Sequence, residues 1–144
     1  MPVYTTFKCI SCRKTVTRAN VKTKIYCSKK CSDKHKHDQW IKEWLCESID
    51  MEKTYSGPDN TISAHIRRYL FEEYDNKCCK CGWSEINPKT MKVPLQVNHI
   101  DGDSTNNRRD NLELICPNCH SLTPTYGRFG KGRKNRYKAG VAQG

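Results

Sequence analysis

Residues 93–120 read VPLQVNHIDGDSTNNRRDNLELICPNCH, and this stretch decides the fold. Val93, Leu95 and Val97 alternate with other residues, which predicts a short strand that ends in a loop. Residues 104–115 predict a polar loop that returns through a second strand. His120 is expected to begin a short helix or turn. The order strand, loop, strand, helix indicates a small α+β unit.

Two cysteine pairs enclose this unit: Cys78 with Cys81, and Cys116 with Cys119. Cys78 is preferred to Cys79 because it gives the two-residue spacing of a zinc knuckle. Four thiolates in two short-spaced pairs suit a tetrahedral structural zinc site. Because the pairs lie far apart in the sequence, we expect the chemistry to reside in the segment between them. The remaining Cys79 and Cys46 are expected to be small, buried or half-buried thiols.

A second cysteine quartet lies near the N-terminus: Cys9 with Cys12, and Cys27 with Cys31. Its spacing also suits a closed four-thiolate zinc site. The first pair is expected after a strand at residues 3–7, and the second pair on the first turn of a helix that continues toward Trp44. His35 is an alternative ligand. The task of this module stays open among DNA contact, protein contact and scaffolding.

Composition favours metal staples over a large core. The chain has 144 residues, of which 35% are hydrophobic, and it has ten cysteines. A small domain with too little apolar core needs disulfides or metals. The N-terminal residues contain no secretory signal and no apolar run is long enough to span a membrane. We therefore expect a cytoplasmic protein, bacterial or in a phage-infected cell, with reduced thiols that bind two zinc ions.

Charge points to a polyanionic partner. The formal net charge is +11, and two four-thiolate zinc sites would lower it to about +7. Nucleic acid is the expected partner ahead of any membrane. A basic surface that only aids solubility is the alternative.

The distribution of charge suggests four segments. Residues 1–36 hold ten Lys or Arg and one acid, and residues 37–76 hold nine acids and four Lys or Arg. We predict an N-terminal zinc finger at 1–36, a helical linker at 37–76, a zinc-bound catalytic core at 77–127 and a basic flexible tail at 128–144. Two apolar stripes predict the linker helices: Trp40, Ile41, Trp44 and Leu45, then Ile62, Ile66, Tyr69, Leu70 and Tyr74. Asn60 or Thr61 is the expected N-cap of the second helix.

Four runs resemble one known family: QVNHIDGD at 96–103, NNR at 106–108, DNL at 110–112 and CPNCHSLTPTY at 116–126. They are similar to the HNH endonucleases, in particular to small bacterial and phage members whose site lies between two CxxC knuckles. The likeness covers about residues 68–132. It implies a ββα-metal nuclease domain behind the N-terminal zinc knuckle and the helical linker.

The resemblance assigns a role to each residue of the motif. His99 would be the general base that takes a proton from water, which suits an imidazole near neutral pH. Asn111 would hold the loop after the first strand through side-chain to backbone hydrogen bonds. His120 would ligate one catalytic divalent cation, Mg²⁺ or Mn²⁺.

The residue before the base usually supplies a second ligand to this cation, and here that residue is Asn98, where many relatives have Asp. An Asn coordinates through a neutral carbonyl oxygen. Either Asn98 completes the site, or Asp101 or Asp103 assists.

The implied reaction is hydrolysis of phosphodiester bonds in double-stranded DNA to 5′-phosphate and 3′-hydroxyl ends. Six basic residues are expected to contact DNA phosphates: Arg108, Arg109, Arg128, Lys131, Arg133 and Lys134. The protein would act as a monomer or as a DNA-bound dimer. Phage homing is one biological role that fits, and restriction or host defence is another.

Two other functions share some of these features. A catalytically silent zinc-finger protein that binds nucleic acid would need the first quartet and the basic tail but not His99. A zinc deaminase would need H-x-E followed by P-C-x-x-C. This chain has Asp101 where the Glu would stand and Ile115 before Cys116, so the deaminase motif is absent.

Overall fold

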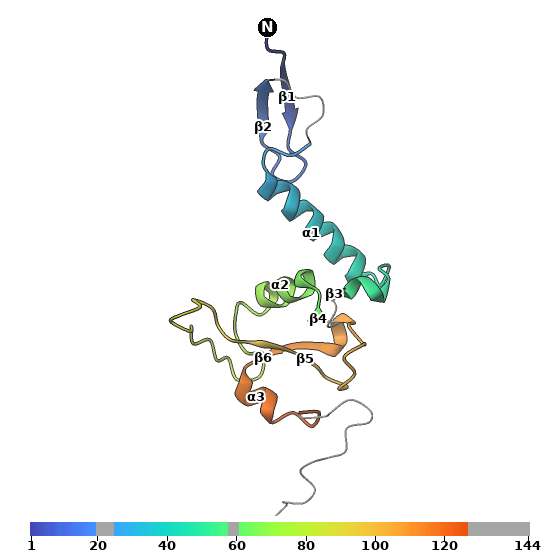
Figure 1. The fold of residues 1–144 in the computed structure, drawn as a ribbon, viewed down its shortest axis with the longest axis vertical. Coiled ribbons are helices and arrows are strands. Elements are labelled where there is room, and N and C mark those ends of the chain that lie inside the picture. The colour runs from blue at the N-terminus through green and yellow to red at the C-terminus, as the bar shows by residue number, and fades with distance from the viewer. Residues whose placement is uncertain (20–24, 58–60, 127–144) are drawn as a thin grey trace, which may run out of the picture. The chain divides into compact units, whose positions relative to one another are not determined.

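A computed structural model describes residues 1–19, 25–57 and 61–126 of the chain (Figure 1). The structure divides into two compact units, Met1–Tyr69 and Leu70–Gly144. Both contain helices and strands, so the protein is a small mixed helix-and-sheet structure. None of the helices in the described ranges is long and apolar enough to cross a membrane. The predicted division into four segments is not tested by these observations and stays a prediction.

The first unit begins with a hairpin. Strands β1 (Tyr4–Lys8) and β2 (Thr15–Ala19) pair antiparallel, with Phe7 opposite Val16. Helix α1 (Lys29–Leu45) follows. The hydroxyl of Ser28 caps it by accepting a hydrogen bond from the Cys31 N–H at 3.2 Å, as an N-cap serine should. Cys31 therefore lies on the first helical turn.

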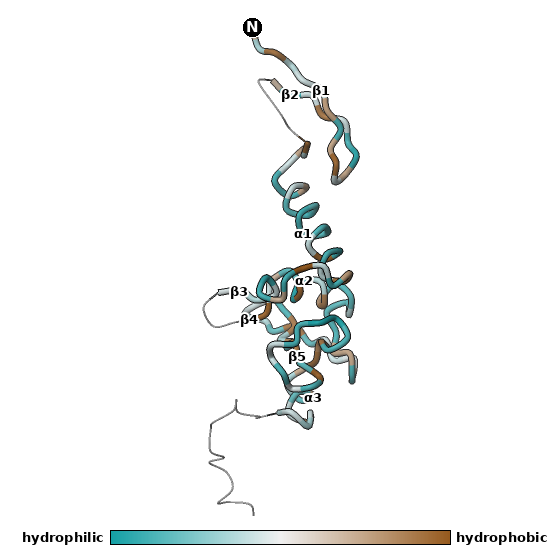
Figure 2. The backbone as a smooth tube through the Cα atoms, turned by 90° about the vertical axis from the view of Figure 1, so that its right-hand side faces the viewer, coloured by the Kyte–Doolittle hydropathy of each residue, from teal (hydrophilic) through white to brown (hydrophobic). Residues whose placement is uncertain are grey.

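The apolar stripe of α1 differs from the predicted one. His37, Ile41 and Trp44 are its buried residues, whereas Leu45 is 43% exposed. Positions i, i+4 and i+7 form one line along a helix, and Leu45 lies off that line at the helix end. The rest of α1 is mainly hydrophilic (Figure 2). The Nδ1 atoms of His65 and His37 lie 2.8 Å apart and share a hydrogen bond. The ring of His65 also stacks on Trp40.

A short segment connects α1 to the second helix. It contains the 3-10 helix η1 (Met51–Thr54) and the paired strands β3 (Tyr55–Ser56) and β4 (Thr61–Ile62). Helix α2 runs from Ala64 to Glu73. The predicted N-cap at Asn60 or Thr61 is wrong: the Ser63 hydroxyl accepts from the His65 N–H at 3.2 Å. Thr61 belongs to β4, so the helix starts only after that strand ends.

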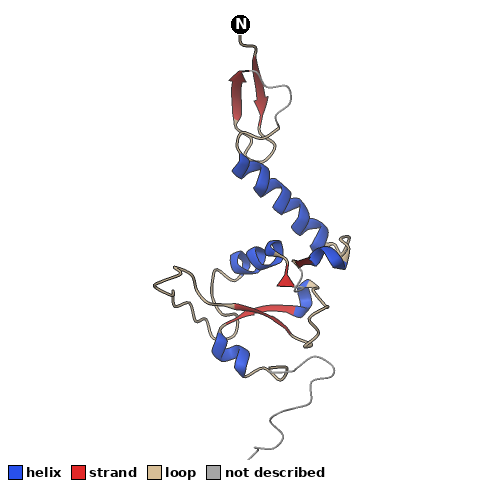
Figure 3. Cartoon of the chain, viewed as in Figure 1, coloured by secondary structure: helices blue, strands red, loops and turns tan. Residues whose placement is uncertain are grey.

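The second unit is built on one strand pair and one short helix (Figure 3). Strands β5 (Gln96–His99) and β6 (Leu112–Ile115) pair antiparallel, with Asn98 opposite Glu113 and His99 opposite Leu112. The 3-10 helix η2 (Arg109–Asn111) precedes β6, and α3 (Pro117–Ser121) follows it. Leu112, Leu114 and Ile115 are almost fully buried, so β6 forms the core of this unit.

Two sequence predictions need correction here. The first strand starts at Gln96 rather than Val93, because Pro94 has no N–H for a strand ladder and the Leu95 N–H turns back to the Val93 carbonyl at 2.8 Å. Val93 and Leu95 are buried nevertheless. His120 does not begin the helix: α3 starts at Pro117, which suits the first helical position, and His120 lies in its fourth position.

Candidate functional site

The first cysteine quartet converges on one point. The sulfur atoms of Cys9, Cys12, Cys27 and Cys31 all lie within 4.8 Å of one another. The Sγ of Cys27 is 3.5 Å from that of Cys12 and 3.4 Å from that of Cys31. Four sulfurs around tetrahedral zinc, each at about 2.3 Å from the metal, would stand roughly 3.8 Å apart. The quartet could therefore hold a structural zinc ion without His35.

The second quartet has the same property. The sulfurs of Cys78, Cys81, Cys116 and Cys119 also lie within 4.8 Å of one another, with Cys81 and Cys116 at 3.7 Å. Gly82 follows the first pair at φ +75°, a backbone conformation that favours glycine. The neighbouring Cys79 donates its N–H to the Leu114 carbonyl at 2.9 Å, so the knuckle is attached to β6.

The local hydrogen bonds favour thiolates at the bases of both knuckles. The backbone N–H of Cys12, followed by that of Cys27, lowers the pKa of Cys9 to about 6. Burial raises the pKa of Cys78, but backbone N–H groups of Cys116, Cys81 and Lys80 outweigh it and bring that pKa to about 6. Contact with neighbouring thiols raises the pKa of Cys27 and of Cys119 to about 12, so each tetrad pairs an acidic thiol with one that shares its proton. Thiolate is the form that binds zinc, and the closeness of the four sulfurs is what fits both tetrads to this metal.

The face of β5 next to α3 carries one predicted site residue, Asn98, and α3 carries another, His120. Because side chains alternate along a strand, Gln96 and Asn98 share one face of β5. The Nδ1 of His120 lies 2.5 Å from Oε1 of Gln96. An amide oxygen only accepts, so Nδ1 carries the proton and Nε2 keeps its lone pair. This is how metal-binding histidines are usually held.

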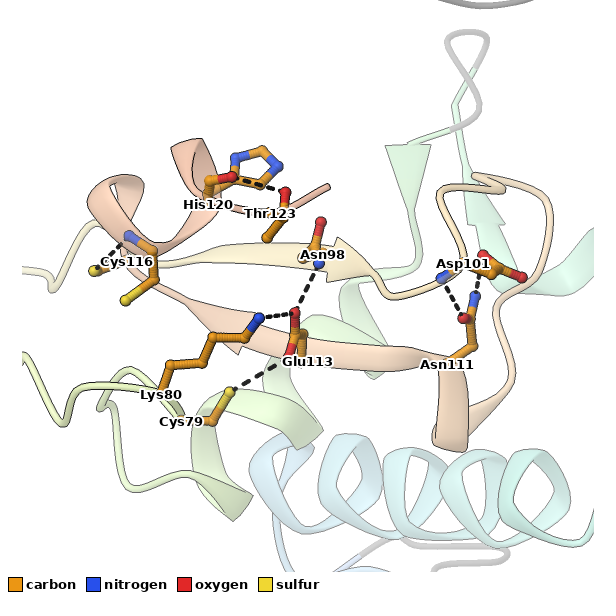
Figure 4. Close-up of polar contacts among 10 residues, drawn as sticks. Cys79, Lys80, Asn98, Asp101, Asn111, Glu113, Cys116, His120 and Thr123 are labelled. Carbon is orange, nitrogen blue, oxygen red and sulfur yellow. Dashed lines mark hydrogen bonds and ion pairs between the residues drawn. The ribbon is translucent and has the colours of Figure 1, made fainter. Parts of the chain in front are cut away.

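Asn98 is buried and its amide is oriented. It is 6% exposed, and its Nδ2 donates to Oε1 of Glu113 on the facing strand at 2.8 Å. Figure 4 shows its oxygen on the opposite side, toward His120. The structure therefore brings a carbonyl oxygen and an imidazole, from β5 and α3, to the same side of the strand pair.

His99 ends β5 and contacts a fully buried amide. Its Nε2 lies 2.7 Å from Oδ1 of Asn107, a residue with 0% exposure. The acceptor oxygen places the proton on Nε2 and leaves the lone pair on Nδ1. His99 can therefore take up a proton at Nδ1 while Asn107 holds the ring.

Asn111 connects the two ends of the loop between the strands. Its Oδ1 accepts from the Asp101 N–H at 3.0 Å, and its Nδ2 donates to Asp101 Oδ1 and to the Asn106 carbonyl, both at 2.8 Å. Figure 4 shows the hydrogen bonds between Asn111 and Asp101. Asn111 is buried. These bonds are of the kind that a loop-holding residue must make.

The two loop carboxylates serve the loop itself. Hydrogen bonds from the Asn106 side chain, the Asp103 N–H and Asn111 lower the pKa of Asp101. The hydroxyl and N–H of Thr105 do the same for the pKa of Asp103. Among the described residues, the two cysteine tetrads are the groups of three or more His, Cys, Asp or Glu side chains close enough to hold a metal. Neither Asp joins His120 in such a group.

The predicted DNA contacts are only partly described. Arg108 is exposed. Arg109 directs its guanidinium to Glu73, to the Tyr74 hydroxyl and to the Leu112 carbonyl, so a phosphate would have to displace one of these partners. Four further predicted contacts and the predicted tail lie outside the described residues: Arg128, Lys131, Arg133 and Lys134.

Three residues of the site received no role from the sequence. Gln96, Asn107 and Glu113 each hold a side chain that did receive one. All lie inside the runs that resemble HNH nucleases or between them. Their polar character at or beside strand positions was a usable signal. Which of them would face His120, His99 or Asn98 depends on strand register, which the sequence does not give.

Comparison with known proteins identifies a partial relative. The chain is 47% identical over 58 residues to the H-N-H endonuclease F-TflIV of Escherichia phage T5, a match that covers 40% of this chain and 25% of the relative. The chain thus matches about a quarter of the length of this relative. No protein-family model and no solved structure matches the chain. The resemblance to HNH endonucleases is therefore confirmed by homology over part of the chain.

Proposed function

We propose that the protein is a metal-dependent DNA endonuclease of the HNH type, in which β5, β6 and α3 form the ββα-metal frame. One observation carries this proposal. His99 and His120 each have one ring nitrogen within hydrogen-bond distance of a side-chain amide oxygen, and in the neutral ring this arrangement puts the lone pair on the other nitrogen. The partial homology to a phage H-N-H endonuclease supports it.

The donor set beside α3 fits a divalent cation. The Nε2 of His120 and the Oδ1 of Asn98 would hold Mg²⁺ or Mn²⁺, which keep water and substrate phosphate as their other ligands. When bound, such an ion polarises a scissile phosphate and offsets the charge on the leaving 3′ oxygen. Gln96 accepts a hydrogen bond from Nδ1 of His120, which leaves Nε2 as the nitrogen that can bind the cation.

The chain's own residues would carry out the proton transfer. His99 accepts a proton at Nδ1 from the attacking water, and Asn107 keeps its Nε2 protonated during this step. Asn111 fixes the loop that contains Asn107 and begins directly after His99. Hydrolysis in this arrangement leaves 5′-phosphate and 3′-hydroxyl ends.

Contacts with DNA phosphates are proposed in both units. In the second unit, Arg108 is a predicted phosphate contact that lies within the described residues and is exposed. In the first unit, a cavity of about 370 Å³ is lined by Arg18, Lys29 and Lys36, with Asp33 as the one acid among its lining residues. Several cations that line one hollow suit a phosphate backbone. Binding through such contacts would be strong at low salt and carry little sequence information.

The source of the relative supports one biological role. Because that relative comes from a phage, we favour a phage or mobile-element role such as homing over restriction or host defence. Action in the bacterial cytoplasm, as a monomer or a DNA-bound dimer, is part of this proposal. The silent zinc-finger alternative predicts DNA binding with no dependence on His99.

The test is cleavage of supercoiled plasmid by zinc-loaded protein with added Mg²⁺ or Mn²⁺. The wild type should nick or linearise the plasmid. His99→Ala and His120→Ala should each lower the rate at least 100-fold, because general-base catalysis alone contributes about 10²–10⁴. His35→Ala is the matched control and should cleave normally. Equal rates for His99→Ala and the wild type would reject the proposal, and ligation of the product ends would check their chemistry.

A further inference from the structure

Glu113 is a carboxylate with little exposure that no catalytic role accounts for. Its side chain is 13% exposed and stands opposite Asn98 in the strand pair. Three groups surround it, as Figure 4 shows. Its Oε1 accepts from Asn98 Nδ2 at 2.8 Å and faces Lys80 Nζ at 3.2 Å, and its Oε2 is 3.9 Å from the Cys79 sulfur.

The contact with Asn98 determines which way that amide faces. An ionised carboxylate has only acceptors, so it binds the NH₂ group of an amide and repels its oxygen. Because Asn98 is 6% exposed, water cannot easily replace this partner. The oxygen therefore points away from Glu113, to the side on which His120 lies (Figure 4).

The same contact places a negative charge beside a neutral ligand. Asn98 brings no charge to the proposed cation, although the carboxylate of Glu113 is one hydrogen bond away. Lys80, which lies between Cys78 and Cys81 of the second tetrad, forms an ion pair with that carboxylate. The knuckle is itself bonded to β6 through Cys79. A chain of contacts thus runs from the zinc tetrad to the amide of Asn98.

We propose that Glu113 is the positioning residue of the catalytic metal site: it aims the Asn98 carbonyl at the cation and supplies the negative charge that Asn98 lacks. This inference rests on the proposed function. It also gives a reason for Asn at position 98. A carboxylate there would face Glu113 with no proton between them, so the pair works when one partner is an amide and the other an acid.

The test uses Mn²⁺ alone as the probe and NMR of zinc-loaded protein without DNA as the readout. Bound Mn²⁺ broadens the ring signals of His120, and titration gives the concentration at half broadening. Glu113→Gln should raise this concentration about tenfold, the lower end of the effect of losing an outer partner of a metal ligand. Glu113→Ala should raise it further, since the amide of Asn98 then has no partner. Glu85→Gln, which removes one exposed acid of the same unit, should leave it unchanged.

A charge-exchange variant separates positioning from stability. Asn98→Asp combined with Glu113→Gln keeps the net charge and reverses the hydrogen bond, because the new amide can donate to the new carboxylate. This double variant should bind Mn²⁺ at least as tightly as the wild type. Zinc content of about two per chain establishes that each variant is folded. If Glu113→Gln itself loses zinc, the double variant still decides the question.

The outcomes distinguish this inference from the proposed function. If Glu113→Gln and Glu85→Gln titrate alike within twofold, or the double variant stays weak, Glu113 has no positioning role, while His99-dependent cleavage can still stand. If Mn²⁺ does not broaden His120 in the wild type, the metal site of the proposed function is wrong and this inference is wrong with it.

Discussion

The two cysteine tetrads have the same ligands and nearly the same sulfur geometry, but they enclose very different segments. The first brings a hairpin to the start of α1, and part of its enclosed segment is strand β2. The second encloses β5, the Asn111 loop and β6, and the residue after its last cysteine is His120. A zinc tetrad fixes only the ends of what it encloses. Whether a catalytic site results depends on the side chains between the pairs.

The surroundings of the tetrads differ in the same sense. Near the first, Arg18, Lys29 and Lys36 line an open cavity. Near the second, the buried side-chain amides of Asn98, Asn107 and Asn111 form hydrogen bonds with Glu113, His99 and Asp101, respectively. No buried side-chain nitrogen or oxygen in the described part of the chain lacks a hydrogen-bond partner. The first region thus suits contact with a polyanion, and the second suits placement of reactive groups.

The largest expected difference comes from removing one ligand of each tetrad. Cys116→Ser should remove most of the zinc-binding free energy of the second tetrad, which is on the order of 10 kcal/mol. This variant should therefore lose cleavage. Cys12→Ser should remove the first zinc but leave cleavage of plasmid at low salt within about tenfold of the wild type. Elemental analysis should find about one zinc per chain in each variant. Equal loss of cleavage in both would break the comparison.

Asn111→Ala should sharpen the account of the second region. It removes the hydrogen bonds of Asn111 to the Asp101 N–H and to the Asn106 carbonyl, each worth about 0.5–1.5 kcal/mol. If this cost appears as misplacement of His99, kcat falls about 10- to 100-fold while zinc content and KM stay unchanged. Asn118→Ala, an exposed amide on α3, is the control. A normal kcat for Asn111→Ala would show that the loop needs no such support.

Lys29→Ala combined with Lys36→Ala should sharpen the account of the first region. Loss of two phosphate contacts lowers the salt slope of DNA binding by about 1.8, measured by fluorescence anisotropy in the His99→Ala background. The control is Lys89→Ala with Lys92→Ala, which removes two exposed charges from the second unit. If both pairs change the slope equally, the cavity is not a specific contact.

The smallest expected effect is that of pH on the first unit. Burial, with the charge of Arg68, lowers the pKa of His65, and His65 shares a hydrogen bond with His37. The unfolded chain therefore binds a proton near pH 6.5 that the folded unit takes up only at lower pH. Stability should fall as pH drops below about 6.5. Hydrogen exchange between pH 7.5 and 5.5 should show faster opening of α1, and His65→Gln should reduce this dependence.

The sequence alone was sufficient to predict the two cysteine clusters. Cysteine spacing identified both tetrads, and the choice of Cys78 over Cys79 agrees with the sulfur positions. The run around His99 indicated the family that homology then supported. These features are local in sequence, because a knuckle or a motif has the same spacing wherever the chain carries it. The start of the first strand, by contrast, was misplaced at Val93, and Leu45 was wrongly expected to be buried.

Only the tertiary structure determined which side chains support the site. Glu113 meets Asn98 because β5 and β6 pair in one particular register, and a shift of one residue would turn each side chain to the other face. Asn107 reaches His99 because the loop closes on Asn111. Gln96 meets His120 because α3 lies against β5. The sequence therefore predicted the reactive residues and their metals, and the fold determined the partners of these residues, since those contacts join residues distant in the chain.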